Sequence, residues 1–348
     1  MSAITAEPTQ VQRARGVLLG LAVGDAVGTT LEFKHRGSFE PLTDMVGGGP
    51  FDLQPGQWTD DTSMALCLGY SLLENGFDPH DQIQRYLRWN DTGYLSSTGR
   101  CFDIGCTTHE ALERYRKTGN AEAGSANPHS AGNGSIMRLA PVPIYYMDSP
   151  EQAVAMSAAQ SSTTHRAAEC LQACRLLAAV LISALQGQGK DDVLAAMQQD
   201  GQKLSAGLND IAQGQFKIKT IDQIRGSGYV VQSLEAALWC FWHTHTFKDC
   251  VLQAANLGDD ADTTAAIAGQ VAGAFYGEGG IPAAWLQRIT FGAEIGQLAE
   301  QLAKAKPTAS ANSRSSYPVM ETSFGSHSRP KPEIATPQLP SGFHYAAP

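Results

Sequence analysis

Two short acidic motifs hold the residues whose types and spacing could do chemistry. They are WTDDTS at residues 58–63 and GDDADT at residues 258–263, and each runs into a stretch of apolar and small residues. Asp and Thr are common N-caps, and carboxylates suit the positive end of a helix dipole. Each motif could therefore cap a helix, one starting near Ser63 and the other near Thr263. One cap needs one oxygen, so capping leaves most of the five carboxylates unexplained.

The same residues are also suited to binding a hard divalent cation. Mg²⁺ prefers carboxylate, hydroxyl and water oxygens, and both motifs place such oxygens where a helix begins. If the two helix starts face each other, two cations about 3.5–4 Å apart would neutralise the repulsion between the carboxylates. Small residues behind the second motif would let a neighbouring helix approach closely and fix the ligands: Ala265, Ala266, Gly269, Ala272 and Gly273.

Two other interpretations of the second motif fit less well. Asp260-Ala-Asp262-Thr-Thr264 matches the Asp-x-Asp-x-Thr pattern of haloacid-dehalogenase-type phosphatases, but that pattern should follow a hydrophobic strand, and AANLG precedes it here. The residues also resemble the start of a calcium EF-hand loop, but Ala265 stands where that loop needs glycine, and no Glu closes it. An Mg²⁺-dependent phosphatase is therefore the least favoured activity.

The elements that must position these motifs are helices. Helical periodicity marks 166–187, 233–244 and 247–258, and Gly258 is suited to end the last of these. Residues 149–152 (SPEQ) have the pattern of an N-cap, a proline at the first helical position and a capping-box glutamine. KIKTI at 217–221 is the only strand candidate, and it is weak. The sequence predicts an all-α domain with a single core.

The first apolar stretch, GVLLGLAVGDAVG, carries a four-residue glycine repeat on one helical face, at Gly16, Gly20, Gly24 and Gly28. We expect this helix to pack closely against a neighbour. Two arginines before the stretch loosely imitate a signal peptide, but Asp25 interrupts it, and it is too short to span a bilayer. We therefore expect a core helix and no membrane partner.

Composition narrows the class of protein. The net charge is −9 and there is no basic run or basic-aromatic stripe, which argues against nucleic-acid binding. The seven cysteines are scattered and odd in number, as in a reduced cytoplasmic protein, and the pair Cys170 and Cys174 is suited to core packing. We expect a monomer.

The chain divides into a predicted catalytic domain at 1–305 and a tail at 306–348. The tail is rich in Ser and Pro and poor in aliphatic residues. It cannot bury enough apolar area to offset its ordering entropy, so we expect it to be disordered or draped over the surface.

Four motifs, taken in order, resemble those of the ADP-ribosylglycohydrolase family, and most closely its dinitrogenase-reductase-activating branch. They span residues 16 to about 277 and read GVLLGLAVGDAVGTTLEF, WTDDTSMAL, GNGSIMRLAPVPI and GDDADTTAAIAGQVAGAFYG. The resemblance implies an all-α fold, a compact multi-helix bundle with a binuclear Mg²⁺ or Mn²⁺ centre between helices.

The resemblance also assigns roles to single residues. Six stand where the family's metal ligands stand: Thr59, Asp60, Asp61, Asp260, Asp262 and Thr263. Asp259 is expected beside the metals rather than on them. The loop that holds ribose and diphosphate is matched by Gly132, Asn133, Gly134 and Ser135, and its backbone N–H groups suit anion binding. His165 matches a family histidine near the ribose.

Two acidic residues resemble the family's catalytic acid or base. Asp103 matches the residue with that role in the dinitrogenase-reductase-activating branch, and Glu32 matches an acidic loop residue near the scissile bond. Simpler alternatives stay open. Asp103 could cap the helix of CTTHEALERY, Glu32 could be a solvated loop charge, and His165 could be a core histidine. Trp58 and Trp89 are expected to pack in the core rather than stack on adenine.

The resemblance implies a metal-dependent hydrolase that removes ADP-ribose from a modified protein, with ADP-ribosyl-arginine and its N-glycosidic bond as the expected substrate. A second function stays open. The chain could be an ADP-ribose-binding protein that neutralises a partner ADP-ribosyltransferase or toxin by occluding it, and the Pro-rich tail keeps this alternative alive.

Overall fold

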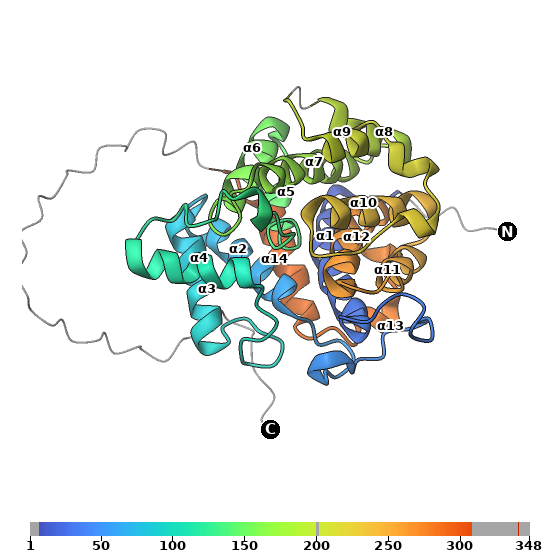
Figure 1. Cartoon of the computed structure of the whole chain (residues 1–348), viewed down its shortest axis with the longest axis horizontal. Coiled ribbons are helices and arrows are strands. Elements are labelled where there is room, and N and C mark those ends of the chain that lie inside the picture. The colour runs from blue at the N-terminus through green and yellow to red at the C-terminus, as the bar shows by residue number, and fades with distance from the viewer. Residues whose placement is uncertain (1–6, 200–201, 308–339, 341–348) are drawn as a thin grey trace, which may run out of the picture.

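The structure is a computed structural model that describes residues 7–199, 202–307 and 340 (Figure 1). Within these residues the regular structure is entirely helical, and only isolated bridges, such as Ser125 with His165, replace strands. The predicted all-α fold is confirmed. Nearly all of the predicted tail at 306–348 lies outside the described residues.

The helices follow one another with short connections. The α-helices are α1 (Gln10–Gly28), α2 (Asp60–Asn75), α3 (Pro79–Thr92), α4 (Cys106–Thr118), α5 (Pro141–Tyr145), α6 (Pro150–Ser161), α7 (Ala168–Leu185), α8 (Lys190–Ala195), α9 (Ala206–Ala212), α10 (Val230–His243), α11 (Phe247–Ala255), α12 (Ala261–Tyr276), α13 (Ala283–Leu286) and α14 (Gly292–Lys304). The 3-10 turns are η1 (Thr29–Leu31), η2 (Gly49–Phe51), η3 (Pro128–Ser130), η4 (Ala196–Gln199), η5 (Gln215–Ile218), η6 (Ile221–Gln223) and η7 (Glu278–Gly280).

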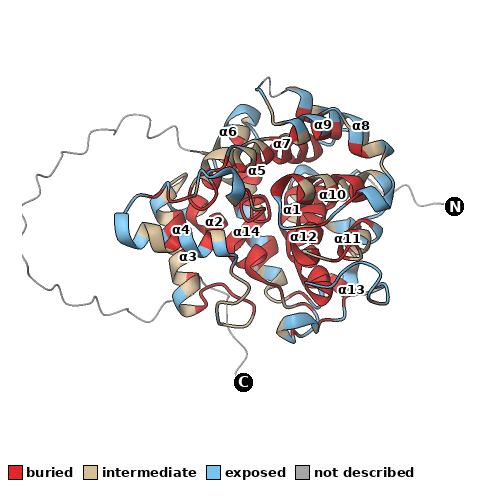
Figure 2. Ribbon diagram, viewed as in Figure 1, coloured by how far each residue is buried: buried red, intermediate tan, exposed pale blue. Residues whose placement is uncertain are grey.

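The helices α1 and α12 form the central pair of the fold and are buried along almost their whole length (Figure 2). A Cβ placed on any of the four repeat glycines would lie only 2.1–2.3 Å from a carbonyl oxygen of α12. The predicted close approach is therefore confirmed, and it depends on the absence of side chains along one face of α1. The facing residues, in order from Gly16 to Gly28, are Gly273, Gly269, Ala265 and Ala261.

Among the described residues, two segments are long and apolar enough to cross a bilayer by length and composition alone. They are Gln10–Leu31 and Ala168–Leu185, and 89% and 67% of their apolar windows are buried inside the protein. Such burial is what core helices show, so the first segment is the core helix expected from the sequence.

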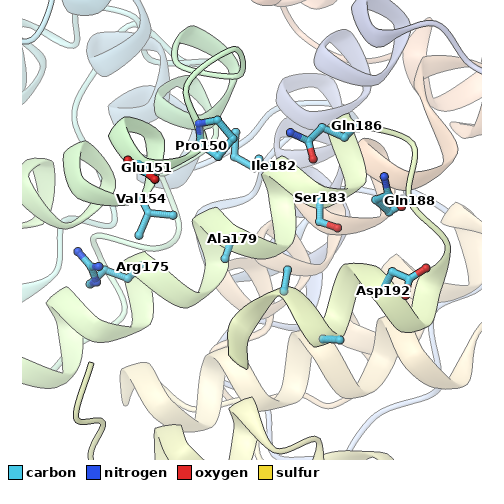
Figure 3. Close-up of a pocket in the computed structure, with 12 residues that line it drawn as sticks. Pro150, Glu151, Val154, Arg175, Ala179, Ile182, Ser183, Gln186, Gln188 and Asp192 are labelled. Atoms are coloured by element: carbon cyan, nitrogen blue, oxygen red, sulfur yellow. The ribbon is translucent and has the colours of Figure 1, made fainter. Parts of the chain in front are cut away.

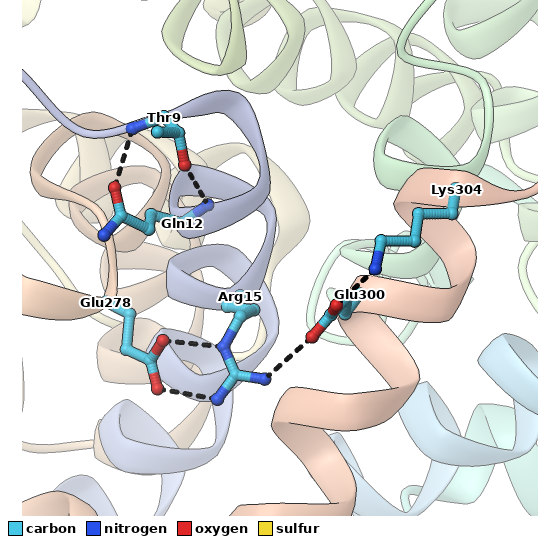
Figure 4. Close-up of polar contacts among 6 residues, drawn as sticks. All are labelled: Thr9, Gln12, Arg15, Glu278, Glu300 and Lys304. Atoms are coloured by element: carbon cyan, nitrogen blue, oxygen red, sulfur yellow. Dashed lines mark hydrogen bonds and ion pairs between the residues drawn. The ribbon is translucent and has the colours of Figure 1, made fainter.

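Polar contacts near the start of α1 fix this helix against Glu278, in the turn after α12, and Glu300 in α14 (Figure 4). Thr9 and Gln12 form a capping box, in which each backbone N–H donates to the other side chain, at 2.8 and 3.2 Å. Arg15 donates two hydrogen bonds to Glu278, at 2.6 and 2.8 Å, and lies 3.6 Å from Glu300 in α14. The N-terminal half of α1 is thereby tied to the chain after α12.

Three local predictions need correction. The strand expected at 217–221 is wrong, because these residues form the turns η5 and η6, and the described chain offers no strand to pair with them. The helix α6 begins at Pro150 as predicted, but the Ser149 side chain makes no capping hydrogen bond. The helix α11 is capped by Asn256, and Gly258 instead adopts φ +71 in the turn that leads into the second acidic motif.

The packing predictions hold. Cys170 and Cys174 are fully buried in α7. Trp58 and Trp89 are also core residues, and the Trp58 indole donates to the Thr290 carbonyl at 3.1 Å.

Candidate active site

The starts of α2 and α12 meet, so the two acidic motifs lie side by side. The Thr59 hydroxyl is 3.2 Å from Asp262 Oδ2, although 203 residues separate them. The Thr263 hydroxyl donates to Asp61 Oδ2 at 3.4 Å. The expected facing of the two helix starts is therefore observed, and it produces one acidic cluster.

Neither motif caps its own helix. The helices begin at Asp60 and Ala261, two or three residues earlier than the capping interpretation expects. The side chains at the N-cap positions, Thr59 and Asp260, make no capping hydrogen bond. Carboxylates from elsewhere do the capping, which leaves those of the motifs free for another role.

Asp25 caps α2 from α1. Its carboxylate is fully buried and accepts from the backbone N–H groups of Thr59 and Thr62, at 2.9 and 3.1 Å. It also accepts from both threonine hydroxyls, at 2.9 and 2.6 Å. Burial, with a further effect from the charge of Asp262, raises the pKa of Asp25 to about 7. In the sequence, the only sign of this capping role is that Asp25 places a charge inside an apolar helix.

Glu32 caps α12 from the turn after α1. Its Oε2 accepts from the N–H groups of Ala261 and Asp262, at 2.8 and 3.3 Å. The side chain is buried, so the alternative of a solvated loop charge is wrong. Glu32, Asp260 and Asp262 each offer an oxygen within 4.8 Å of the others. Glu32 therefore belongs to the acidic cluster, and its role as a catalytic acid or base stays a prediction.

The chemistry of this cluster fits divalent cations. Asp60, Asp61 and Asp262 are buried, and in the described part of the chain no Lys or Arg pairs with them. One oxygen of Asp61 is buried without any hydrogen-bond partner. Burial, followed by the charge of Asp262, raises the pKa of Asp60 and Asp61 well above the usual range and that of Asp260 to about 7. Two cations would relieve this repulsion and supply the missing partner.

Asp259 directly precedes the cluster residue Asp260, and its expected position beside the metals stays a prediction. Its backbone adopts φ +58, and its carboxylate pairs with the exposed His35 ring at 2.9 Å. It therefore faces away from the carboxylates that gather between the helices.

A cavity of about 350 Å³ opens over the cluster and brings most of the predicted site residues together. Those that line it are Glu32, Asp60, Asp103, Gly132, Asn133, Gly134, His165, Asp260, Asp262 and Thr263. Thr59 and Asp61 are not in its lining but touch Asp262 and Thr263 from below. Ser135 is also absent from the lining, since its hydroxyl lies 3.5 Å from the Cys174 thiol in the core.

Asp103 enters the cavity from the loop before α4. The N-cap of that helix is Gly105, which has no side-chain capping bond, so the capping alternative for Asp103 is wrong. Its backbone is left-handed, with φ +60, an uncommon conformation that turns up at functional sites. Burial and then the charge of Asp262 raise the pKa of Asp103 to about 11. Its surroundings therefore favour the protonated form of this carboxyl.

The glycine loop is fixed to both the histidine and the cluster. A Cβ on Gly134 would lie 2.7 Å from the ring of His165, so glycine is needed for this contact. Asn133 donates to Asp260 Oδ2 at 2.8 Å. The Nδ1 atom of His165 lies 2.8 Å from the Thr164 hydroxyl, and burial lowers the pKa of His165 to about 3, so the ring is neutral. His165 is both buried and part of the cavity wall.

A larger cavity in the described part of the chain lies elsewhere. It measures about 770 Å³ and is lined by residues of α6, α7 and α8 and of neighbouring turns (Figure 3). Its acidic residues, Glu151 and Asp192, come from different helices (Figure 3) and do not form a cluster like the one above. Cavity volume alone would therefore select the wrong cavity, and the acidic residues that line the smaller cavity identify the candidate site.

The fold and site together define an all-α protein with an acidic centre held between two helix N-termini. A sequence profile described as ADP-ribosylglycohydrolase matches residues 6–312. The chain belongs to the ADP-ribosylglycohydrolase family.

Individual relatives agree with this assignment. The chain is 48% identical to the ADP-ribosylarginine hydrolase Tri1 of Pseudomonas putida, over 88% of this chain and 82% of that protein. It is 35% identical to the ADP-ribosyl-dinitrogen reductase glycohydrolase of Rhodospirillum rubrum, over 81% and 92%. A solved chain described as an ADP-ribosylglycohydrolase-related protein complex superposes with a TM-score of 0.76 at 42% identity, over 84% and 98%.

Proposed function

We propose that this protein is a metal-dependent hydrolase that removes ADP-ribose from ADP-ribosyl-arginine in a modified protein. The observation that carries the proposal is the convergence of two acidic helix starts, a glycine loop and Asp103 on one cavity. Relatives that are 48% and 46% identical to this chain bear the name ADP-ribosylarginine hydrolase, which supports arginine as the acceptor.

The ligands for two Mg²⁺ or Mn²⁺ ions would be the clustered oxygens of Thr59, Asp60, Asp61, Asp260, Asp262 and Thr263. Glu32 joins this set because its carboxylate lies within 4.8 Å of two of them. When bound, such ions would neutralise the carboxylates, orient the ribose hydroxyls and polarise a water molecule.

The chain's own residues then account for the proton transfers. Backbone N–H groups of the loop at Gly132–Gly134 suit the diphosphate, and the neutral His165 beside them suits a ribose hydroxyl. Asp103 is placed to take a proton from the water that attacks the anomeric carbon. As the C–O bond forms, the C–N bond to the guanidine breaks and its electron pair goes to the nitrogen. That nitrogen takes the proton held by Asp103, so unmodified arginine and ADP-ribose leave and the Asp103 carboxylate is restored.

The partners follow from this reaction. The substrate is an ADP-ribosylated protein, so an ADP-ribosyltransferase must act before this enzyme. Occlusion of such a transferase remains a prediction, because the tail that suggested it lies outside the described residues. A cytoplasmic location and a monomeric state likewise stay predictions.

The direct test is release of free ADP-ribose from an ADP-ribosyl-arginine peptide, followed by mass spectrometry with Mg²⁺, with Mn²⁺ and with EDTA. We expect metal-dependent release from the arginine peptide and slower release from an ADP-ribosyl-serine peptide. Tight ADP-ribose binding without release under any metal would contradict the proposal and favour a binding protein.

A further inference from the structure

An exposed phenylalanine stands at the mouth of the active-site cavity. Phe33 is 65% exposed, although it lines the same cavity as Glu32 and Asp103. Its backbone is left-handed, with φ +63, and its N–H donates to the Asp259 carbonyl at 2.8 Å. A bulky residue at positive φ is a genuine outlier. The fold therefore holds an apolar ring in water, at a strained position, beside an acidic site.

Two further rings continue from Phe33 outside the lining of the cavity. The ring centroids of Phe33 and Phe51 are 6.3 Å apart, edge to face, and those of Phe51 and Phe102 are 5.2 Å apart. The rings come from three separate loops, and Phe102 directly precedes Asp103. We call these three residues the aromatic rim. It runs from the loop of Glu32 to the loop of Asp103, two acidic residues that line the cavity.

The chemistry of the rim suits the part of the substrate that lies outside the cavity. Within the cavity, the carboxylates and the glycine loop account for ribose and diphosphate. The acceptor side chain must emerge past the mouth, and a substituted guanidinium is planar and positively charged. Aromatic faces attract such cations. A serine acceptor offers neither a plane nor a charge.

We propose that the aromatic rim, through Phe33, binds the guanidinium of the acceptor arginine and makes the site selective for that acceptor. This rests on the proposed hydrolysis of ADP-ribosyl-arginine. Because the contact already exists in the bound substrate, it should act mainly on KM.

The test compares wild type with Phe33→Leu and Phe33→Trp on the ADP-ribosyl-arginine peptide. Phe33→Leu keeps an apolar side chain but removes the aromatic face, and we expect kcat/KM to fall about 3- to 30-fold, mainly through KM. Phe33→Trp restores an aromatic face and should recover most of the loss. Calorimetry should give an unchanged Kd for free ADP-ribose. Ile218→Ala, at an exposed apolar residue outside the cavity lining, is the control and should behave as wild type.

The outcomes separate the two claims. Absence of release by the wild-type enzyme would overturn the proposed function, and the acceptor assignment with it. A Phe33→Leu enzyme with wild-type kcat/KM would overturn the role of the rim alone. Weaker binding of free ADP-ribose by Phe33→Leu would also overturn it, because the ring would then contact the nucleotide rather than the acceptor. Melting temperatures measured in parallel show whether each variant is folded.

Discussion

Gly28 joins the central helix pair to the acidic cluster, and its replacement by alanine should damage both. A Cβ there would lie 2.3 Å from the Ala261 carbonyl oxygen and 2.5 Å from Asp262 Cα, whereas real Cβ contacts almost never fall under 3.0 Å. The backbone of Gly28 is helical, with φ −67 and ψ −37, so alanine would not be strained by its own conformation. The start of α12 would have to move instead.

The size of the effect follows from that displacement. Forcing extra volume into a packed core costs typically 1–3 kcal/mol, and alanine regains roughly 0.5–1 kcal/mol over glycine within a helix. We expect Gly28→Ala to lower the free energy of unfolding by about 1–2 kcal/mol. Asp262 must shift by about half an ångström. Metal–ligand distances tolerate only about 0.2 Å, so Mn²⁺ affinity should fall about 10- to 100-fold.

Two other glycines serve as controls in urea unfolding and Mn²⁺ calorimetry. Gly16→Ala makes an equally close contact, 2.2 Å from the Gly273 carbonyl oxygen, but in the N-terminal half of α1, away from the cluster. It should lose stability and keep Mn²⁺ affinity. Gly279→Ala meets no atom within 4 Å and should change neither quantity. The reasoning would be refuted by a Gly28→Ala protein with wild-type stability and Mn²⁺ affinity, or by equal losses of affinity in Gly16→Ala.

Three more predictions follow from the site. Asp25→Asn keeps the side-chain size but replaces one oxygen that accepts hydrogen bonds from the start of α2 with an N–H donor. Calorimetry should therefore show about tenfold weaker Mn²⁺ binding. Unchanged Mn²⁺ binding would exclude a role of Asp25 in positioning the ligands. Asp103→Asn should lower kcat on the arginine peptide about 10²–10⁴-fold while Mn²⁺ affinity stays at the wild-type level, and a change below threefold would remove Asp103 from the mechanism. Asp25 and Asp260 have pKa values raised from 3.8 to about 7 in the folded protein. Their contribution to stability is therefore complete below about pH 4 and is lost as the pH rises through 7. The melting temperature in EDTA should fall across this range, and saturating Mg²⁺ should raise it most at pH 8; a metal effect independent of pH would contradict this.

The parts of the structure that the sequence could predict are those set by local pattern. The four-residue spacing of the repeat glycines predicted the close helix packing, because a helical face without side chains lets a neighbouring backbone approach closely. The excess of carboxylates over caps in the two acidic motifs indicated one shared site. Helical periodicity located α7 and α10 to within a few residues.

The parts that the sequence could not supply depend on contacts between distant segments. Glu32 caps a helix that begins 229 residues later, and no local pattern marks that pairing. Asp25 caps α2 from 34 residues earlier in the chain, and in the sequence it is only a charge within an apolar run. The segment at 217–221 has strand-like residues but no partner strand among the described residues, so it forms tight turns instead.

The central claim is that two acidic helix starts form a single metal site that hydrolyses ADP-ribosyl-arginine. The most direct measurement is ADP-ribose release from the arginine peptide as a function of Mn²⁺ concentration, for wild type, Asp61→Asn and Asp262→Asn. Asp61 lies in α2 and contacts Thr263 of α12, whereas Asp262 lies in α12 and contacts Thr59 at the start of α2. We predict metal-dependent release by wild type and a loss on the order of 10³-fold or more in both variants. Wild-type release by either variant, or release by wild type that persists in EDTA, would contradict the account.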